Sequence, residues 1–375
     1  MKSENRLGLY IERLDRPNTD LRYGISDVCG ITNVKQLVVG TKANLIGRTF
    51  EKFSILAPKE FIFNRRTSRN GERISLGYNT TDREWILTED YCHFRVRADK
   101  LNELDPDFLY LFFLDPEFDR YARFNSWGSA TEFFNWEEMQ NVPIKVPPME
   151  VQKKAIKECN IISTRIQLLR DESQKLKELA LTFYYEYASE SSVSLRRFPG
   201  IKEISSGISI FDGQKAYWAT GDIDEDNTQD EISMITYTER PSRANMQPTL
   251  NSIWFAKMQN TKKVLYFTEN DENLSKVILS TGFMGLQCIP DNVYYVLAFI
   301  YSDYFEQQKN QCATGTTQIA INSSALDKIE IRQPKDEVKN VNTLLRPLFE
   351  EINLINNEIS ALSRMRKVLI SLYTA

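Results

Sequence analysis

The chain has 375 residues, of which 42% are hydrophobic and 26% are charged, and its formal net charge is −4. This length allows two to three domains with proper cores, and the composition is ordinary for a soluble globular protein. The longest apolar runs fall far short of a membrane span, the N-terminus lacks the apolar stretch of a signal peptide, and five widely spaced cysteines without a CxxC pair favour free thiols. We therefore expect a cytoplasmic protein that does not enter a membrane.

Residues 1–147 are predicted to form a mixed α/β domain with short strands. A polar loop is expected around Asn70-Gly71, a strong turn dipeptide. Within 92–96, apolar and polar side chains alternate, which is the period-two pattern of a half-buried strand. The apolar run 108–114 follows an Asp-Pro-Asp start signal and predicts a buried helix.

A short segment of this domain is repeated later in the chain. Residues 128–147 align without gaps on 315–334, with four identities in twenty positions. The identical residues are Gly128, Asn135, Ile144 and Pro147, which correspond to Gly315, Asn322, Ile331 and Pro334. Each copy opens, just after its proline, into a long helix, and proline is accepted in a helix only in the first turn. The chain is therefore predicted to be a duplicated domain–helix unit.

Two long helices are the clearest structural prediction, since each has an apolar stripe at steps of four and three for nearly four heptads. The residues that we expect in the seam are Ile162, Ile166, Leu169, Leu176 and Phe183 of the first helix and Ile352, Ile355, Ile359, Leu362 and Leu369 of the second. Paired as an antiparallel coiled coil, helices of about 39 residues would span roughly 58 Å and carry the two domains at opposite ends. The alternative is that both stripes belong to ordinary core helices of a larger α+β fold.

The second half repeats the pattern of the first. Residues 188–194 are small and polar and are expected as a linker, 217–223 as a strand running into a turn, and 293–300 as a second buried helix. We therefore expect an α+β fold with two α/β domains separated by two long helices and related by a pseudo-twofold internal repeat. The predicted boundaries are 1–147 for the first domain, 148–190 for the central helix, 191–334 for the second domain and 335–375 for the C-terminal helix.

Basic residues gather in one segment of each half, although the overall charge is negative. Residues 35–73 contain nine Lys and Arg against three acidic residues, and 239–263 contain five against one, whereas 222–231 hold six carboxylates. Arg reads guanine edges, Asn reads adenine, and Lys, Ser and Thr hold phosphates, so both segments suit DNA. The candidate DNA-binding residues are Lys59, Arg65, Arg66, Arg69 and Arg73 in the first segment and Arg240, Arg243, Lys257, Lys262 and Lys263 in the second, where Trp254 is interspersed. The alternative for each segment is a solvated turn.

The sequence offers no catalytic apparatus. The one histidine, His93, lies in a strand pattern, where a lone histidine is usually structural, and without a second histidine or a Cys pair a zinc site of usual spacing is excluded. Residues 40–49 match a phosphate loop only by chance, because the glycines are six residues apart and Arg48 replaces the lysine. Methyltransferase motifs and a marked acid/base carboxylate pair are also missing. We predict no catalytic residue, no metal site and no cofactor.

Short motifs follow one another in a fixed order along the chain, namely LGLYIE at 7–12, YWATGDI at 217–223, and a Gly…Asn…Pro closing segment at 128–148 and again at 315–334. In their order and duplication they resemble the specificity (S) subunits of type I restriction–modification enzymes, which have an opening LGxYI segment, a W(I)xxGDI segment and a similar segment closing each domain. The resemblance covers essentially the whole chain. The departures are Glu132-Phe133-Phe134 in place of a Gly-Thr-Thr-Arg-like run, and a second helix without the Gln that Gln152 supplies in the first.

This resemblance implies a non-catalytic DNA-recognition subunit. Each globular domain would be a target-recognition domain that reads one half of a bipartite double-stranded DNA site. The helix pair would set the spacing and dock two modification (methyltransferase) subunits, and restriction subunits, where present, would supply cleavage. Two other hypotheses stay open on the residues alone: an enzyme with its own nucleic-acid chemistry, and a coiled-coil protein-binding scaffold without sequence-specific DNA binding.

Overall fold

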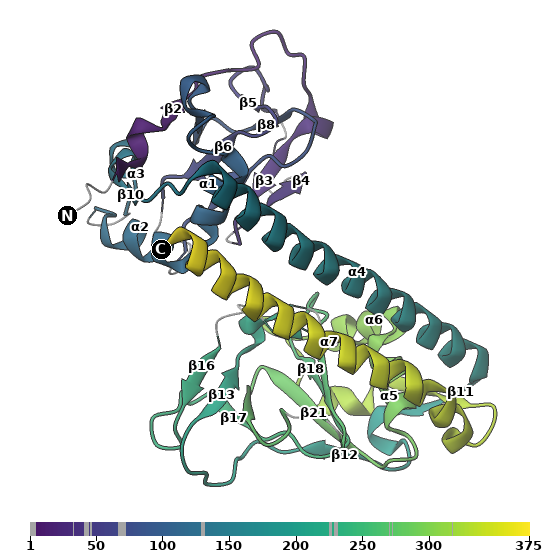
Figure 1. Ribbon diagram of the computed structural model, residues 1–375. Coiled ribbons are helices and arrows are strands. Elements are labelled where there is room, and N and C mark those ends of the chain that lie inside the picture. Colours follow the sequence, from purple (N-terminus) through teal and green to yellow (C-terminus); the bar gives the residue numbers. More distant parts are fainter. Residues whose placement is uncertain are drawn as a thin grey trace. The chain divides into compact units, whose positions relative to one another are not determined.

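The computed structural model describes residues 5–32, 34–40, 45, 47–66, 73–128, 132–224, 227–228, 232–269, 271, 273–316 and 318–375. The chain forms two compact units, which we call unit 1 (Met1–Ser163 and Met365–Ala375) and unit 2 (Thr164–Arg364). Each unit contains a mixed α/β domain and a segment of both long helices (Figure 1).

Unit 1 is built around a four-stranded antiparallel sheet with the strand order β2-β9-β6-β7. Its strands are β2 (Ile11–Arg13), β6 (Phe61–Asn64), β7 (Leu76–Tyr78) and β9 (Tyr91–Val96). A second layer contains the pairs β3 (Cys29–Ile31) with β4 (Leu37–Val39) and β5 (Ser54–Leu56) with β8 (Trp85–Leu87). The remaining elements are α1 (Pro106–Leu114), α2 (Pro116–Phe124), α3 (Trp136–Asn141) and the pair β1 (Asn5–Arg6) with β10 (Pro143–Ile144).

The four-stranded sheet of unit 1 is covered on both faces. Phe61 and Phe63 pack into one core cluster with α1 and α2, whereas Ile62 between them packs against Leu56 and Trp85 of the second layer. This alternation follows from the period of two along a strand. The strand expected at 92–96 is present as β9, but the expectation that it is half-buried is wrong, because four of its six residues are buried and they point to both faces.

Unit 2 has the same arrangement around the sheet β12-β21-β18-β19. Its strands are β12 (Ile201–Ile204), β18 (Ser252–Ala256), β19 (Val264–Phe267) and β21 (Phe283–Cys288), and the second layer is the sheet β16 (Ser233–Ile235), β13 (Lys215–Trp218), β20 (Val277–Ser280) and β17 (Ala244–Met246). The helices are α5 (Val293–Tyr301) and α6 (Asp303–Cys312), and the short pair is β14 (Ile223–Asp224) with β15 (Asn227–Thr228). The segment expected as a linker, 188–194, is instead strand β11 (Ala188–Ser194), which pairs with β22 (Glu330–Pro334).

The two units repeat one topology. In both central sheets the last strand in sequence, β9 or β21, lies between the first strand and the hairpin formed by the other two. Both sheets are followed by a pair of short helices, and the corresponding helices α1 and α5, and α2 and α6, start 187 residues apart. A parallel pairing also recurs: Val28 bridges Ile86 of β8, and β13 pairs parallel with β20. The predicted α+β fold with two α/β domains, two long helices and an internal repeat is confirmed.

The long helices are α4 (Met149–Tyr187, 39 residues) and α7 (Val338–Thr374, 37 residues). Within unit 2 they run antiparallel: the Nε of Arg165 donates to Glu358 Oε1 at 2.9 Å, and the backbone N–H of Lys335 donates to the carbonyl of Tyr187 at 2.7 Å. Within unit 1, Tyr373 near the end of α7 donates its hydroxyl to Glu158 of α4 at 2.8 Å. Each unit is therefore tied to both helices.

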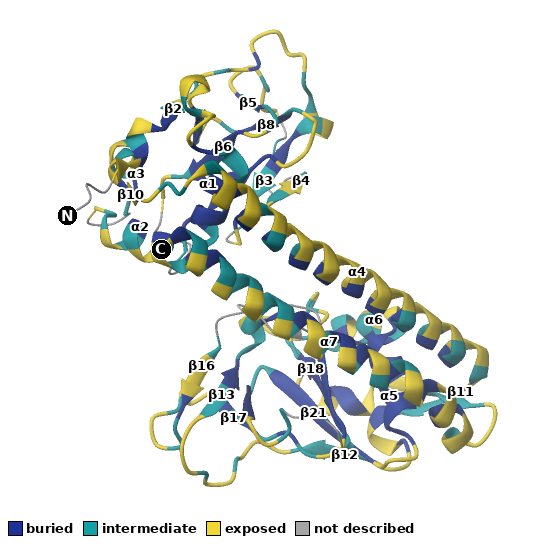
Figure 2. Cartoon of the chain, viewed as in Figure 1, coloured by how far each residue is buried: buried dark blue, intermediate teal, exposed yellow. Residues whose placement is uncertain are grey.

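The buried stripe of α4 follows the heptad pattern only at first (Figure 2). Ile162, Ile166 and Leu169 are buried, as are the later residues Lys177, Ala180 and Tyr184, whereas Leu176 and Phe183 are half-buried beside them. Relative to a strict heptad repeat, a straight helix of 3.6 residues per turn drifts by about 20° per heptad. Over the length of α4 this drift moves the buried stripe by one residue. On α7, Ile352, Ile355 and Ile359 are buried, and Leu362 and Leu369 are half-buried.

Candidate nucleic-acid interface

Four candidate arginines of the first basic segment belong to the connection between β6 and β7, which pair as a hairpin. Arg65 and Arg66 directly follow β6 and are exposed, and the carbonyl of Arg65 accepts a hydrogen bond of 2.8 Å from the backbone N–H of Phe134. Arg73 is half-buried just before β7, and Arg69, with the turn at Asn70-Gly71, lies outside the described residues. The hairpin therefore carries its arginines on a backbone that is held at its base.

Lys59 stands apart from this hairpin. Its backbone is left-handed, with φ of 63°, and its side-chain nitrogen lies 2.7 Å and 3.0 Å from the two carboxylate oxygens of Asp107. The same nitrogen lies 5.8 Å from the centre of the Tyr78 ring. The Lys59 side chain is 53% exposed, so it is available to solvent, but its charge is already matched by a carboxylate.

The base of the hairpin rests on one buried ion pair that the sequence did not single out. Lys35 is 3% exposed, and its Nζ lies 2.5 Å from Asp119 Oδ2 on α2. The other oxygen of Asp119 accepts a hydrogen bond of 3.0 Å from the backbone N–H of Ile74. Burial lowers the pKa of Lys35, and the nearby Asp119 carboxylate counteracts that shift.

In unit 2 the corresponding hairpin joins β18 to β19 and contains three of the candidate lysines. Lys257 and Lys263 do not point freely into solvent, because their side-chain nitrogens donate to the carbonyls of Thr281 (2.8 Å) and Thr220 (2.7 Å). Burial also lowers the pKa of Lys257. Lys262 is exposed and lies 3.0 Å from Asp303.

The remaining candidates of unit 2 lie before β17. The guanidinium of Arg240 stacks over the Tyr237 ring at 4.3 Å and donates to the Tyr237 carbonyl. Arg243 is exposed, and its side chain makes no hydrogen bond or ion pair with any described residue. Trp254, which we expected among these basic residues, is fully buried and donates to Ser252 at 2.9 Å, so it cannot contact a ligand.

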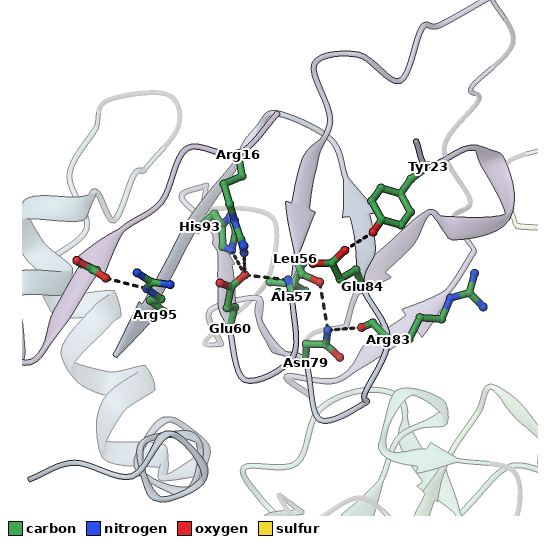
Figure 3. Close-up of polar contacts among 11 residues, drawn as sticks. Arg16, Tyr23, Leu56, Ala57, Glu60, Asn79, Arg83, Glu84, His93 and Arg95 are labelled. Atoms are coloured by element: carbon green, nitrogen blue, oxygen red, sulfur yellow. Dashed lines mark hydrogen bonds and ion pairs between the residues drawn. The ribbon is translucent and has the colours of Figure 1, made fainter. Parts of the chain in front are cut away.

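The polar centre of unit 1 is a structural network and not a reactive site. His93 is 2% exposed, and its Nε2 lies 2.9 Å from Glu60, whose carboxylate also accepts from Arg16 and from the backbone N–H of Ala57 (Figure 3). Burial opposes the ionisation of Glu60, but hydrogen bonding to His93 and the nearby charges outweigh it, so its pKa is lowered. A buried carboxylate with this many donors holds strands together.

The buried cysteines are equally unreactive. Cys29, Cys92, Cys159 and Cys288 are buried, and none of the five is in a disulfide. Burial raises the pKa of Cys29 and Cys288 to about 12 and that of Cys92 to about 11, which keeps these thiols protonated. Among the described residues, no three His, Cys, Asp or Glu side chains converge on a metal position, and no helix is long and apolar enough to cross a membrane.

Two exposed aromatic side chains beside the first hairpin were missed at the sequence level. Phe124, the last residue of α2, is 84% exposed and Trp127 is 69% exposed. From sequence alone, large aromatic residues such as these are expected in the core. The one available signal was their position directly before the repeated closing segment 128–147.

Comparison with known proteins points to one family. Residues 30–178 match the family model of the type I restriction modification DNA specificity domain. The fold resembles the crystal structure of the type I restriction-modification system S subunit from M. genitalium, with a TM-score of 0.50 and 10% identity over 100% of this chain and 97% of that one. It is also similar to the HsdS subunit from Thermoanaerobacter tengcongensis, with a TM-score of 0.35 and 14% identity over 98% and 95% of the two chains. No curated protein matches the sequence.

Proposed function

We propose that this chain, which belongs through residues 30–178 to the type I restriction modification DNA specificity family, reads a bipartite DNA site as a non-catalytic subunit. DNA target recognition is the function of that family. In the proposal, each globular domain is a target-recognition domain that reads one half of the site. The domains are those predicted from the sequence, 1–147 and 191–334, with the helices 148–190 and 335–375 beside them.

The observation that carries this proposal is the duplicated hairpin. In both units the hairpin of the central sheet, β6–β7 or β18–β19, has a connection that contains several basic residues. Outside these basic residues, the sequences of the two connections differ. Two copies of one scaffold with different side chains suit a target with two different halves. Arg65, Arg66, Arg69 and Arg73 of unit 1 and Arg240, Arg243 and Lys262 of unit 2 would contact DNA, while Lys59, Lys257 and Lys263 would mainly hold the loops in place.

We assign the long helices a spacing and docking role. Since α4 and α7 are antiparallel and continuous, they would fix the distance between half-sites, which a flexible linker would not do. Two modification subunits would dock on them and carry out the methyl transfer, with restriction subunits where these are present. The assembly would work on chromosomal and incoming DNA in the cytoplasm.

Methylome sequencing of a host with and without this gene tests the proposal. We expect one split adenine-methylation motif to disappear on deletion, because recognition and not catalysis is lost. A methylome that does not change would refute the proposal. Salt-dependent DNA binding of the purified chain separates it from a protein-only scaffold, since phosphate contacts weaken steeply as salt rises.

The hairpin is tested by replacing Arg65, Arg66 and Arg69 together with Ala. We expect recognition of one half-site to be lost while assembly with the modification subunits persists, because the long helices are untouched. The matched control replaces three exposed arginines outside the hairpin and the long helices, Arg22, Arg97 and Arg120, and makes the same change in charge. An unchanged half-site preference in the first variant would mean that the hairpin faces solvent.

A further inference from the structure

The hairpin of unit 1 is widened by a third chain segment into a small ribbon. Phe133 forms an antiparallel bridge with Arg66 on one side and with Trp127 on the other. Trp127 and Phe133 exchange both backbone hydrogen bonds, at 3.1 Å and 2.9 Å, and the neighbouring Phe134 donates to Arg65 at 2.8 Å. Arg66, Phe133 and Trp127 are therefore three adjacent positions on one rung.

The side chains of this rung share the outer face of the ribbon. Residues directly opposite each other on antiparallel strands point to the same face, with Cβ atoms about 5 Å apart. Phe134 is fully buried in the core of unit 1, and successive residues point to opposite faces, so Phe133 points outward. Arg66 is exposed and Trp127 is 69% exposed, in agreement with this placement.

Unit 2 builds the same ribbon with other side chains. Ala320 bridges Met258 and Thr314, Thr314 and Ala320 exchange hydrogen bonds of 3.0 Å and 3.1 Å, and Ile321 donates to Lys257 at 3.0 Å. Ile321 is buried, like its counterpart Phe134. The outer rung of unit 2 is therefore Met258, Ala320 and Thr314 where unit 1 has Arg66, Phe133 and Trp127.

We propose that this outer rung is a specificity-determining surface that contacts base edges of double-stranded DNA. The proposal rests on the proposed function and adds the side chains that distinguish the two half-sites. A β-ribbon fits the major groove, where Arg is the commonest reader of guanine and apolar side chains contact the thymine methyl group. Arg66 supplies the donors, and Trp127 with Phe133 supplies the apolar surface.

The neighbourhood favours DNA over a protein partner for this face. Arg66 is exposed on this face, and the described part of the ribbon carries one acidic residue, Glu132, which is paired with Arg123 at 2.8 Å. An aromatic surface beside an exposed arginine is complementary to stacked bases between phosphates.

The test transplants the rung of unit 2 into unit 1, as Arg66→Met, Phe133→Ala and Trp127→Thr in the full chain. A second variant changes Trp127→Thr alone, since an exposed side chain can be removed with little effect on folding. The control is Phe124→Gln, which removes an even more exposed aromatic residue outside the ribbon and places there the residue found 187 positions later, Gln311. Each gene replaces the native one, and adenine methylation is sequenced genome-wide.

We expect both ribbon variants to relax one half of the split motif and leave the other half unchanged. Discrimination at one or more positions should fall by about fivefold to a hundredfold, the range of a single base contact. Phe124→Gln should keep the motif. If both ribbon variants methylate the native motif with native efficiency, or if they only weaken assembly with the modification subunits, the proposal is overturned.

Failure of the proposed function gives a different result, because the native gene then specifies no split motif at all. If the triple variant loses all methylation, its thermal midpoint and the Trp127→Thr variant show whether the chain has unfolded or has lost base contacts. With a native midpoint, a lost motif supports base contact. If Trp127→Thr retains the full motif, the rung does not read DNA through this residue, and the proposal is rejected.

Discussion

The Lys35–Asp119 pair makes a sharp prediction, because one carboxylate holds both a buried ammonium and the base of the basic hairpin. Asp119 lies 2.5 Å from Lys35 and accepts from the backbone N–H of Ile74 at 3.0 Å. The substitution Asp119→Asn keeps an oxygen that can accept from Ile74 and removes only the charge. It therefore isolates the effect of leaving Lys35 buried without its counter-ion.

The expected loss of stability is large. Lys35 and Asp119 side chains are 4% and 13% exposed, and removing one partner of a buried pair costs about 3–5 kcal/mol. We expect Asp119→Asn to lower the free energy of unfolding of unit 1 by about 3 kcal/mol. Adding Lys35→Met should restore a good part of it, since both buried charges are then absent. The control Glu117→Gln breaks an exposed pair on the same helix and should cost at most about 1 kcal/mol.

The pH dependence of Asp119→Asn has a definite sign. Burial lowers the pKa of Lys35 in the folded chain, and the variant loses the carboxylate that counteracts this shift. Below the ordinary lysine value the unfolded chain then binds more protons than the folded chain, so stability rises with pH. The variant should therefore recover stability relative to the native chain as the pH rises toward the ordinary lysine value, and the double variant should not.

Hydrogen exchange of peptides from β9 and α1 is the appropriate assay, because it reports unit 1 alone, whereas tryptophan fluorescence mixes both units. The reasoning is refuted if Asp119→Asn is as stable as the control, or if the double variant is less stable than the single one at every pH.

Two further predictions concern packing and the helix pair. Gly285→Ala in β21 should lower the stability of unit 2 by about 1–3 kcal/mol, because the added Cβ would lie 2.4 Å from the buried Trp254 ring. The control Gly221→Ala meets nothing within 4 Å and should be neutral. Equal thermal midpoints of the two variants would contradict this prediction. A double-mutant cycle of Arg165→Ala and Glu358→Ala should give a coupling free energy of at most about 1 kcal/mol, because this interhelical ion pair is about half exposed. The coupling should vanish in 1 M salt. A larger coupling that resists salt would be inconsistent with a surface ion pair.

The sequence predicted the architecture better than the candidate site. Heptad spacing located both long helices, and the repeat of 128–147 at 315–334 anticipated the duplicated topology. Burial within the sheets was not predictable, because the layer that covers β9 includes β3, which lies far earlier in the chain. The partners of two candidate lysines were not predictable for a similar reason. Lys257 and Lys263 donate to carbonyls of residues far along the chain, Thr281 and Thr220, and composition carries no information about such partners.

The four identities of the repeat explain how one scaffold can serve two specificities. Gly128 and Gly315 have φ of 149° and 127°, where a side chain is strained, and a Cβ on Gly315 would lie 2.4 Å from the Gln318 carbonyl. Asn135 and Asn322 precede short helices as their N-caps, and Ile144 and Ile331 are buried.

Pro147 and Pro334 stand just before the long helices, so all four shared positions determine backbone course or core packing. None belongs to the outer rung of the ribbon, where the two copies share no residue. On the proposed assignment, the positions that determine the fold and those that would read the target are therefore separate, so changing Arg66, Phe133 and Trp127 should alter the half-site without altering the backbone that presents them.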